Sequence, residues 1–415
     1  MKLKEIFTLV TKSVTPQPDV HYHLYSLPSF DENQTREEVK GREIMSNKLV
    51  VPNKCILFNK LNVRFKRVWM IDNQDSNKLA STEFLPLVVN EDKVDFKFAY
   101  YLLISDIVTN YLSGQNSNTS GSHKRINSEV LLDINVNLPS RAEQERIGKL
   151  LSELDAKIAL NREINRNLEA MARQLYDYWF VQFDFPDENG RPYKSSGGKM
   201  VWNEKLKREI PAGWEVKKIV NIEPNIITGK TPSTSRSEYF GGNIPFVTID
   251  DIRATRFVRI STRTLTDIGA STQSSKYLPY GSLMCSCIGT VGVMGFCGCV
   301  LQTNQQINSI VFTNYRNAQY IFIALEKYFK STDAKVGNIL PNMSKQEFGD
   351  IPVIYPTSPI ITKFAELSRC CFEHISVISK EIETLTCQRD ELLPLLMNGQ
   401  VSVMPTEVNC DLSHD

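Results

Sequence analysis

Two sets of residues have the types and spacing that could support chemistry. The first consists of four cysteines arranged as two C-x-C pairs, Cys285, Cys287, Cys297 and Cys299. If the two runs form a hairpin, all four thiols could lie on one face and bind zinc. Structural zinc sites more often use C-x₂-C spacing, and these cysteines lie among Met, Val and Phe. Small buried residues are therefore the favoured interpretation.

The second set would suit a magnesium-dependent nuclease. Pro186-Asp187 is followed by Glu215-Val216-Lys217, so two carboxylates could bind Mg²⁺ with a lysine near the attacking water. So short a pattern often arises by chance. The segment SSGGK at 195–199 lacks the residues of a phosphate loop, and no grouping of Ser, His and Asp is visible. The sequence therefore predicts no catalytic residue, no cofactor and no metal ion.

Charge is balanced overall but unevenly distributed. The chain has 48 Lys and Arg against 47 Asp and Glu, a net charge of +1. Residues 225–345 contain 12 basic against 6 acidic residues, whereas residues 357–415 contain 4 against 9. A basic stretch suits a polyanion and an acidic one suits a different partner. Without an export signal or a membrane-length apolar run, we expect a cytoplasmic protein with free thiols and no membrane contact.

The elements that would position functional residues occur twice in the 415-residue chain. Residues 138–183 contain apolar residues at alternating steps of three and four, the spacing of a coiled-coil seam, and adding 217 to each position gives a second seam. The apolar seam residues are Ile147, Leu151, Leu154, Ile158, Leu168 and Leu175 in the first helix, and Ile375, Ile378, Ile382, Leu385, Leu392 and Leu396 in the second.

The matching register predicts that the two helices pack on each other. Antiparallel helices of about 33 residues would be about 50 Å long and would act as a spacer. The alternative is that each helix packs only on its own domain. Asn161 and Asn165, in the middle of the first seam, could fix the register of the pair or face a partner protein.

The segments before the helices also correspond. MKLKEI at the amino terminus resembles WEVKKI, residues 49–60 resemble 277–288, and residues 79–89 resemble 301–312. Short runs rich in Val, Ile, Phe and Thr predict β-rich mixed domains, each with a helix, at about 96–112 and about 317–330. We expect an α+β chain with an internal two-fold repeat: a first domain (1–138), a spacer helix (139–183), a polar linker with little regular structure (184–211), a second domain (212–356), a second spacer helix (357–400) and a tail (401–415).

Several motifs resemble those of a known family. They are the helix start LPSRAEQERI, the segment from YDYWFVQFDFPDENG to WEVKKI, and GKTPSTSRSEYFGGNIPFVTIDDI, CIGTVG and LQTNQQ. Together they resemble the DNA specificity subunit of type I restriction and modification systems, over essentially the whole chain. The first domain departs from the pattern, with TKSVTPQP at 11–18 in place of a Gly-Lys-Thr-Pro segment.

The resemblance implies two target-recognition domains, each reading one half of a split site in double-stranded DNA. The helices would set the unread gap and bind two adenine methyltransferase subunits, and restriction (translocase) subunits would join the complex. It implies no catalysis by this chain itself. Two rival functions stay open, a magnesium-dependent endonuclease and a coiled-coil scaffold without DNA contacts.

Basic and polar residues in acid-free or Gly, Ser and Asn rich stretches are the candidates for DNA contact. They could bind phosphates or read base edges; the alternative is a strand edge kept basic against aggregation. The candidates are Lys60, Arg64, Lys66, Arg67, Lys124, Arg125, Lys230, Thr231, Arg236, Arg253, Arg256, Lys276, Lys335 and Asn342, and Lys54, Arg259 and Arg263 lie in the same stretches.

Overall fold

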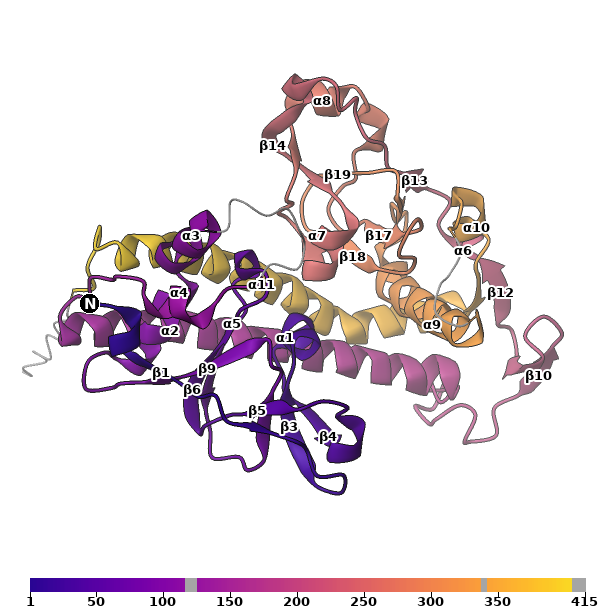
Figure 1. The fold of residues 1–415 in the computed structure, drawn as a ribbon. Helices are drawn as coiled ribbons and strands as arrows, with labels where there is room; N and C mark the ends of the chain where they lie inside the picture. The colour runs from indigo at the N-terminus through magenta and orange to yellow at the C-terminus, as the bar shows by residue number, and fades with distance from the viewer. Residues whose placement is uncertain (116–124, 337–341, 405–415) are drawn as a thin grey trace, which may run out of the picture. The chain divides into compact units, whose positions relative to one another are not determined.

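A computed structural model describes residues 1–115, 125–336 and 342–404. The chain forms two compact units, residues 1–158 together with the chain from residue 385 onward, and residues 159–384. Two long helices, α5 (Arg141–Tyr176) and α11 (Ser358–Met397), each contribute one end to either unit (Figure 1). A π-helical turn, Asp177–Val181, continues α5. The predicted α+β fold with two β-rich regions and a packed pair of long helices is confirmed.

The first unit contains two sheets. The antiparallel sheet has the order β1-β9-β6-β7, formed by β1 (Phe7–Leu9), β9 (Phe84–Val89), β6 (Lys54–Asn59) and β7 (Val68–Asp72). The other sheet has the order β2-β5-β8-β3-β4, formed by β2 (Ser13–Val14), β5 (Lys48–Val50), β8 (Lys78–Ala80), β3 (His21–Tyr25) and β4 (Glu37–Lys40). Its helices are α1 (Leu27–Asn33), α2 (Phe96–Ile104), α3 (Asp106–Gln115) and α4 (Ser128–Leu132).

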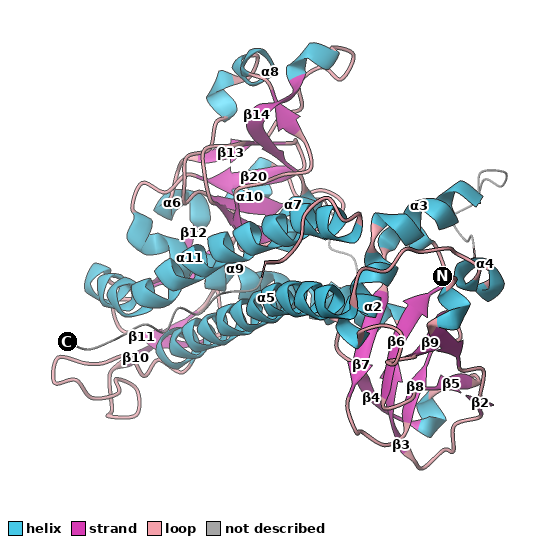
Figure 2. Cartoon of the chain, turned by 90° about the vertical axis from the view of Figure 1, so that its left-hand side faces the viewer, coloured by secondary structure: helices cyan, strands magenta, loops and turns pink. Residues whose placement is uncertain are grey.

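The second unit repeats this plan with additions (Figure 2). Its main sheet has the order β13-β20-β17-β18-β15, formed by β13 (Ile226–Thr228), β20 (Ile307–Ile310), β17 (Leu283–Ser286), β18 (Met294–Cys297) and β15 (Phe257–Val258). A smaller sheet contains β16 (Thr264–Leu265), β14 (Phe240–Val247) and β19 (Gln302–Thr303), and two strand pairs join β10 (Met200–Asn203) to β11 (Arg208–Pro211) and β12 (Glu215–Lys218) to β21 (Pro352–Tyr355). The helices are α6 (Ile219–Ile222), α7 (Ile249–Ala254), α8 (Asp267–Ser271), α9 (Ala318–Val336) and α10 (Lys345–Gly349).

Local contacts repeat as well as strand order. The short helices α4 and α10 begin after side-chain caps, Asn127 and Ser344, that lie 217 residues apart like the seams. Such caps satisfy backbone N–H groups that a helix leaves without partners at its start. In the first unit Asp133 pairs with Lys2 at 3.1 Å, and in the second Asp350 pairs with Lys218 at 2.9 Å. The internal repeat is therefore structural.

The two long helices pack antiparallel. All twelve apolar seam residues are buried or half-buried. The Arg389 guanidinium lies 2.8 Å from the Asp155 carboxylate in the first unit, and the Asn165 amide lies 3.3 Å from the Ser379 hydroxyl in the second. In an antiparallel pair, the numbers of facing residues have a constant sum. Both pairs here add up to 544, so the two contacts share one register. Asn165 thus bonds within the pair, and Asn161 is 1% exposed.

Each unit builds its core on its own part of this pair. In the first unit Ile147 and Leu151 of α5 and Leu396 of α11 pack with the apolar residues of α2 and the main sheet. In the second unit Phe364 and Ile375 of α11 pack with α9 and the main sheet. The helices are therefore part of both hydrophobic cores. Within the part of the chain that is described, no helix is long and apolar enough to span a membrane.

Two elements differ from the sequence predictions. The helix predicted at 96–112 is interrupted at Ser105, which is extended (ψ 160°) and whose hydroxyl bonds to the Leu102 carbonyl, so α2 and α3 are separate. The segment 184–211, predicted to have little regular structure, contains the β10–β11 hairpin. Phe185 and Ile210 in this segment are buried with Trp214, and this aromatic packing folds the polar chain back on itself.

Candidate nucleic-acid interface

One group of candidate residues gathers around the hairpin loop between β6 and β7. The backbone N–H of Lys60 donates to the Glu83 carbonyl, and the Lys60 carbonyl accepts from the N–H of Ile126, both at 2.9 Å. The second contact brings Arg125 beside the loop, where its Nε donates to the Glu83 carboxylate at 2.9 Å. We call residues 60–67, Glu83 and Arg125 the first loop cluster. It places cations and a carboxylate at one end of the sheet's strands.

The turn inside this loop has an unusual backbone. Asn62 (φ 52°) and Lys66 (φ 43°) are left-handed and flank a single 3₁₀ turn, Val63–Phe65. Arg64 is exposed, and the Phe65 side chain is 62% exposed. Lys66 bonds to Asp106 of α3 at 2.6 Å, which anchors the far end of the turn.

Arg67 follows the turn, and its side chain is bonded within the first unit. Its Nε and Nη2 donate to the two carboxylate oxygens of Asp31 at 2.6 and 2.7 Å, a bidentate ion pair. The guanidinium also lies 4.8 Å from the centre of the Phe65 ring. Only 17% of the Arg67 side chain is exposed, so its charge is largely committed within the unit.

A second group forms around the equivalent loop between β17 and β18, residues 287–293. The N–H of Met343 donates to the Cys287 carbonyl at 2.7 Å, and the N–H of Gly289 donates to the Asn342 side-chain oxygen at 3.0 Å. The Arg253 guanidinium donates to the Thr290 hydroxyl at 2.9 Å. Nearby, the Thr231 hydroxyl bonds to the side chain of Gln305. We call residues 287–293 with Thr231, Arg253, Gln305 and Asn342 the second loop cluster.

The two clusters are built on the same backbone plan. Each cluster lies on an antiparallel hairpin, β6–β7 or β17–β18. The first strand of the hairpin also pairs with another strand, β9 or β20, and the turn before that strand contains Glu83 or Gln305. In each unit the segment before the short helix, α4 or α10, runs beside the hairpin loop. It contributes Arg125 to the first cluster and Asn342, which lies 217 residues later, to the second. The side chains nevertheless differ, with Arg125 and Glu83 in one and Asn342 and Gln305 in the other.

Other candidates lie outside the clusters. Arg236, Arg263 and Lys276 are exposed or half-buried around β14, β16 and α8, and Lys230 is exposed after β13. Lys54 pairs with Glu91 at 2.7 Å. Lys124 and the side chain of Lys335 lie outside the described residues.

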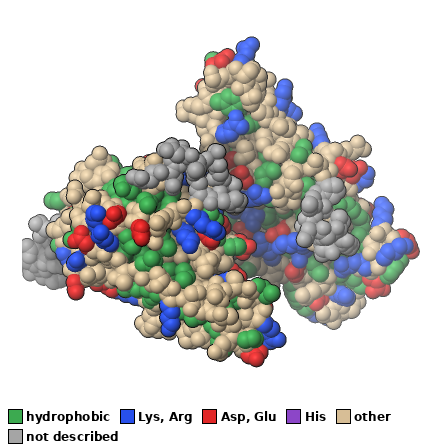
Figure 3. Space-filling model, in the orientation of Figure 1, with side chains coloured by type: hydrophobic (Ala, Val, Ile, Leu, Met, Phe, Trp, Pro, Cys, Tyr) green, Lys and Arg blue, Asp and Glu red, His purple; other side chains and the backbone are tan. Residues whose placement is uncertain are grey.

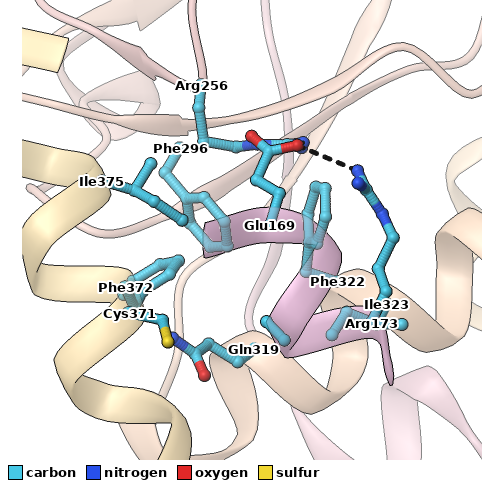
Figure 4. Close-up of a pocket in the computed structure, with 11 residues that line it drawn as sticks. Glu169, Arg173, Arg256, Phe296, Gln319, Phe322, Ile323, Cys371, Phe372 and Ile375 are labelled. Carbon is cyan, nitrogen blue, oxygen red and sulfur yellow. Dashed lines mark hydrogen bonds and ion pairs between the residues drawn. The ribbon is translucent and has the colours of Figure 1, made fainter. Parts of the chain in front are cut away.

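Two predicted DNA contacts, Arg256 and Arg259, are engaged inside the second unit. Arg256 donates to both carboxylate oxygens of Glu169 at 2.9 and 2.7 Å and lies 4.1 Å from the Phe322 ring centre. Glu169 also bonds to Arg173 (Figure 4). Arg173 in turn pairs with Glu326 at 2.8 Å. Burial by itself raises the pKa of Glu169, but the two guanidinium groups outweigh it and hold that pKa below its usual value.

Arg259 is held in a similar way. Its Nη2 donates to the carbonyl and the hydroxyl of Ser376 in α11, both at 2.9 Å, and only 16% of the side chain is exposed. Both arginines therefore fasten the second unit's sheet to the long helices. The DNA contacts predicted for Arg256 and Arg259 would require these bonds to break.

A small pocket lies beside this ion network. It encloses about 30 Å³ and is lined mainly by apolar side chains, including Phe296, Phe372 and Ile375 (Figure 4). That is room for about two water molecules.

The residues considered for chemistry are engaged in structural contacts. Cys285 and Cys297 are 0% exposed on adjacent strands of the main sheet. The Asp187 carboxylate accepts from backbone N–H groups of its own turn at 2.8 Å, and Glu215 pairs with Lys217 at 3.2 Å. Among the residues that are described, no three Cys, His, Asp or Glu side chains form a group that could hold a metal ion.

Basic side chains are interspersed with acidic ones on the face that Figure 3 shows. This mixture agrees with the net charge of +1. This face is therefore not uniformly basic.

Comparison with known proteins identifies the family. The type I restriction modification DNA specificity domain matches residues 1–170 and 211–383, one copy on each repeat. The chain belongs to this family. The resemblance in the motifs is thereby confirmed, and the specificity subunit is a non-catalytic component of its restriction system.

Relatives of this specificity subunit extend over most of its length. The HindI specificity subunit of Haemophilus influenzae is 30% identical over 397 residues, covering 83% of this chain and 86% of the relative. The MjaIX specificity subunit of Methanocaldococcus jannaschii is 23% identical over 410 residues, covering 97% and 89%. The crystal structure of an S subunit from M. genitalium has the same fold, with a TM-score of 0.56 at 16% identity and 95% of both chains covered.

Sequence reasoning did not select every residue of the loop clusters. Glu83, Phe65, Thr290 and Gln305 were not among the candidates, most of which are basic. The similarity of 49–60 to 277–288 and of 79–89 to 301–312 contained the signal, because it aligns the two hairpins and the turns beside them.

Proposed function

We propose that the two units of this specificity subunit each read one half of a split DNA site through their loop clusters. The observation that supports this most directly is the pair of equivalent hairpin loops that display different side chains. A common scaffold lets both loops approach DNA in the same way, and different side chains select different bases. A protein with a single uninterrupted target would not need this arrangement.

The side chains in the clusters suit base recognition. Arg253 could bind guanine O6 and N7, and the amides of Gln305 and Asn342 match the donor and acceptor of adenine in the major groove. In the first cluster Arg125 suits guanine, and Glu83 could accept from the amino group of cytosine. In the free protein Arg125 bonds to Glu83, whereas Arg253, Gln305 and Asn342 bond to Thr290, Thr231 and the Gly289 N–H. Binding would exchange those bonds for bonds to bases.

Other cations suit phosphates. Arg64, Lys60 and Lys66 in the first unit, and Lys230, Arg236 and Lys276 in the second, are at least partly exposed and would position each unit on the backbone of the duplex. Lys124 and Lys335 stay predictions of the same kind. Arg67, Arg256 and Arg259 suit structural roles better, because each is held by bonds within its own unit.

The long helices suit a spacer that also binds partners. They are continuous between the units, and 36 and 40 residues correspond to about 54 and 60 Å. Exposed apolar side chains remain on their outer faces, including Leu160, Met171, Leu367 and Val377. Such exposed residues suit protein contacts. We assign these faces to two adenine methyltransferase subunits, with restriction subunits joining the complex.

The test is to map methylated adenines in DNA modified by the full chain assembled with its methyltransferase subunits. A split site with a fixed unread gap is expected. The variant Gln305→Ala should relax the preference at one or two positions in a single half-site, because only the second loop cluster changes. Exposed Gln400→Ala, outside both clusters, is the control. An uninterrupted site, or relaxation in both halves, would contradict the proposal.

A further inference from the structure

Phe65 is an exposed aromatic residue at the tip of the first loop cluster. Its side chain is 62% exposed, although phenylalanine is usually buried. Three basic residues, Arg64, Lys66 and Arg67, lie beside it in the chain, and Lys66 and Arg67 are paired with acidic side chains. A single exposed apolar residue is common and by itself indicates nothing. Two further observations distinguish this one.

The first is that the turn is rigid and strained. Asn62 and Lys66 adopt left-handed conformations, which are strained for a residue such as lysine and better tolerated by asparagine. Backbone hydrogen bonds Phe65 N to Asn62 O and Lys66 N to Val63 O, both at 3.1 Å, close the turn. The ion pair of Lys66 with Asp106 anchors it to α3. The fold therefore exposes the ring on a defined turn, and backbone strain of this kind clusters at functional sites.

The second observation is the equivalent loop of the other unit. The β17–β18 loop also presents an apolar side chain, Ile288, which is 37% exposed next to Gly289 and Thr290. Both hairpin loops thus place an apolar group among polar ones at the same edge of the sheet. This repetition is unexpected for an incidental exposed residue.

We propose that Phe65 reads the first half-site by apolar contact with the 5-methyl group of a thymine in the major groove. Phenylalanine is among the side chains that recognise this methyl group. One face of the ring lies against Arg67, at 4.8 Å, so only its edge and other face are free. This geometry suits contact with a methyl group. Insertion between base pairs suits it less, because an inserted side chain has a base against each of its two faces. The inference rests on the proposed reading of a split site.

The test uses the full chain in its methyltransferase complex and a duplex that contains its mapped site. Each thymine of the first half-site, on either strand, is replaced singly by deoxyuridine, which lacks only the methyl group. A half-site with a methylated adenine always contains a thymine on the opposite strand. For the unmodified protein, one replacement should weaken binding about fourfold, the contribution of one buried methyl group. For Phe65→Ala the same replacement should have no effect.

Met45→Ala is the matched control, since Met45 is 92% exposed in the same unit and lies outside the loop cluster. It should keep the response of the unmodified protein to every deoxyuridine. The proposal is overturned if no thymine responds in the unmodified protein, or if Phe65→Ala keeps the full response. Failure of the proposed function would look different, because the unmodified complex would then show no split site at all.

Discussion

Replacing Glu169 by Gln tests how the second unit is fastened to the long helices. The Glu169 carboxylate accepts from Arg256 at 2.9 and 2.7 Å and from Arg173 at 3.0 Å. The amide would keep the shape but lose the charge. Arg173 would still pair with Glu326, whereas Arg256 would lose its ion pair and keep one hydrogen bond, to the amide oxygen, and its place over the Phe322 ring.

The expected loss of stability is about 2 kcal/mol. Removing one partner of a fully buried ion pair costs about 3–5 kcal/mol, and the side chains of Glu169 and Arg256 retain 21% and 17% exposure, which reduces the cost. Urea unfolding followed by tryptophan fluorescence reports mainly on this unit, because Trp179, Trp202 and Trp214 lie in it and Trp69 alone lies in the first unit. The exposed pair Arg369–Glu373 supplies the control, Glu373→Gln, with an expected loss below about 0.5 kcal/mol.

The difference in stability between the unmodified protein and Glu169→Gln should depend on pH, because the pKa of Glu169 is lowered in the folded protein. A carboxyl group with a depressed pKa in the folded state stabilises the fold above its unfolded pKa of about 4.3. That stabilisation is lost as the pH falls through the folded pKa. The unmodified protein should therefore be more stable than Glu169→Gln at pH 7, and the difference should shrink below about pH 4. A loss under about 0.5 kcal/mol at pH 7, or a difference independent of pH, would refute the reasoning.

Three further outcomes are expected. Inserting four residues after Glu163 and after Lys380, the matching positions of the two helices, adds about 6 Å and should lengthen the unread gap by one or two base pairs with both half-sites unchanged; methylation mapping that finds the old gap would exclude the helices as the spacer. Arg64→Gln should reduce the slope of log binding constant against log salt by up to about one, and an unchanged slope would remove Arg64 from the interface. Gly292→Ala should destabilise the second unit by at least about 1 kcal/mol, because φ is +90° and the new Cβ would lie 3.0 Å from the Phe329 ring; unchanged unfolding would argue against this loop geometry.

The long helices were predictable because their signal is periodic and occurs twice. Seam positions 217 residues apart gave the antiparallel pair, and the packed register agrees with them. The break at Ser105 was not predictable, since the residues on both sides favour a helix and the bond from the Ser105 hydroxyl to Leu102 depends on local geometry. The β10–β11 hairpin was missed because its sequence is polar, while the buried aromatic residues that fold it lie at its ends.

The candidate interface was predictable in part. The local composition favoured basic residues as candidates for DNA contact. Charge alone, however, does not show which basic side chains are already paired inside the folded protein. Arg256 lies in an acid-free stretch of the sequence, and its partner Glu169 is 87 residues away. The meeting of Arg125 with Glu83 likewise depends on strand order. The exposure of Phe65 depends on two left-handed residues that no sequence pattern indicates.

The central claim is that each unit reads one half-site independently, and a domain exchange tests it most directly. Residues 1–138, which end before α5, would be replaced by the matching segment of another specificity subunit with a known target. The chimaera would be assembled with the methyltransferase subunits and its methylated adenines mapped. One half-site should change to that of the donor, while the other half-site and the gap stay as they were. Changes in both half-sites would contradict the account.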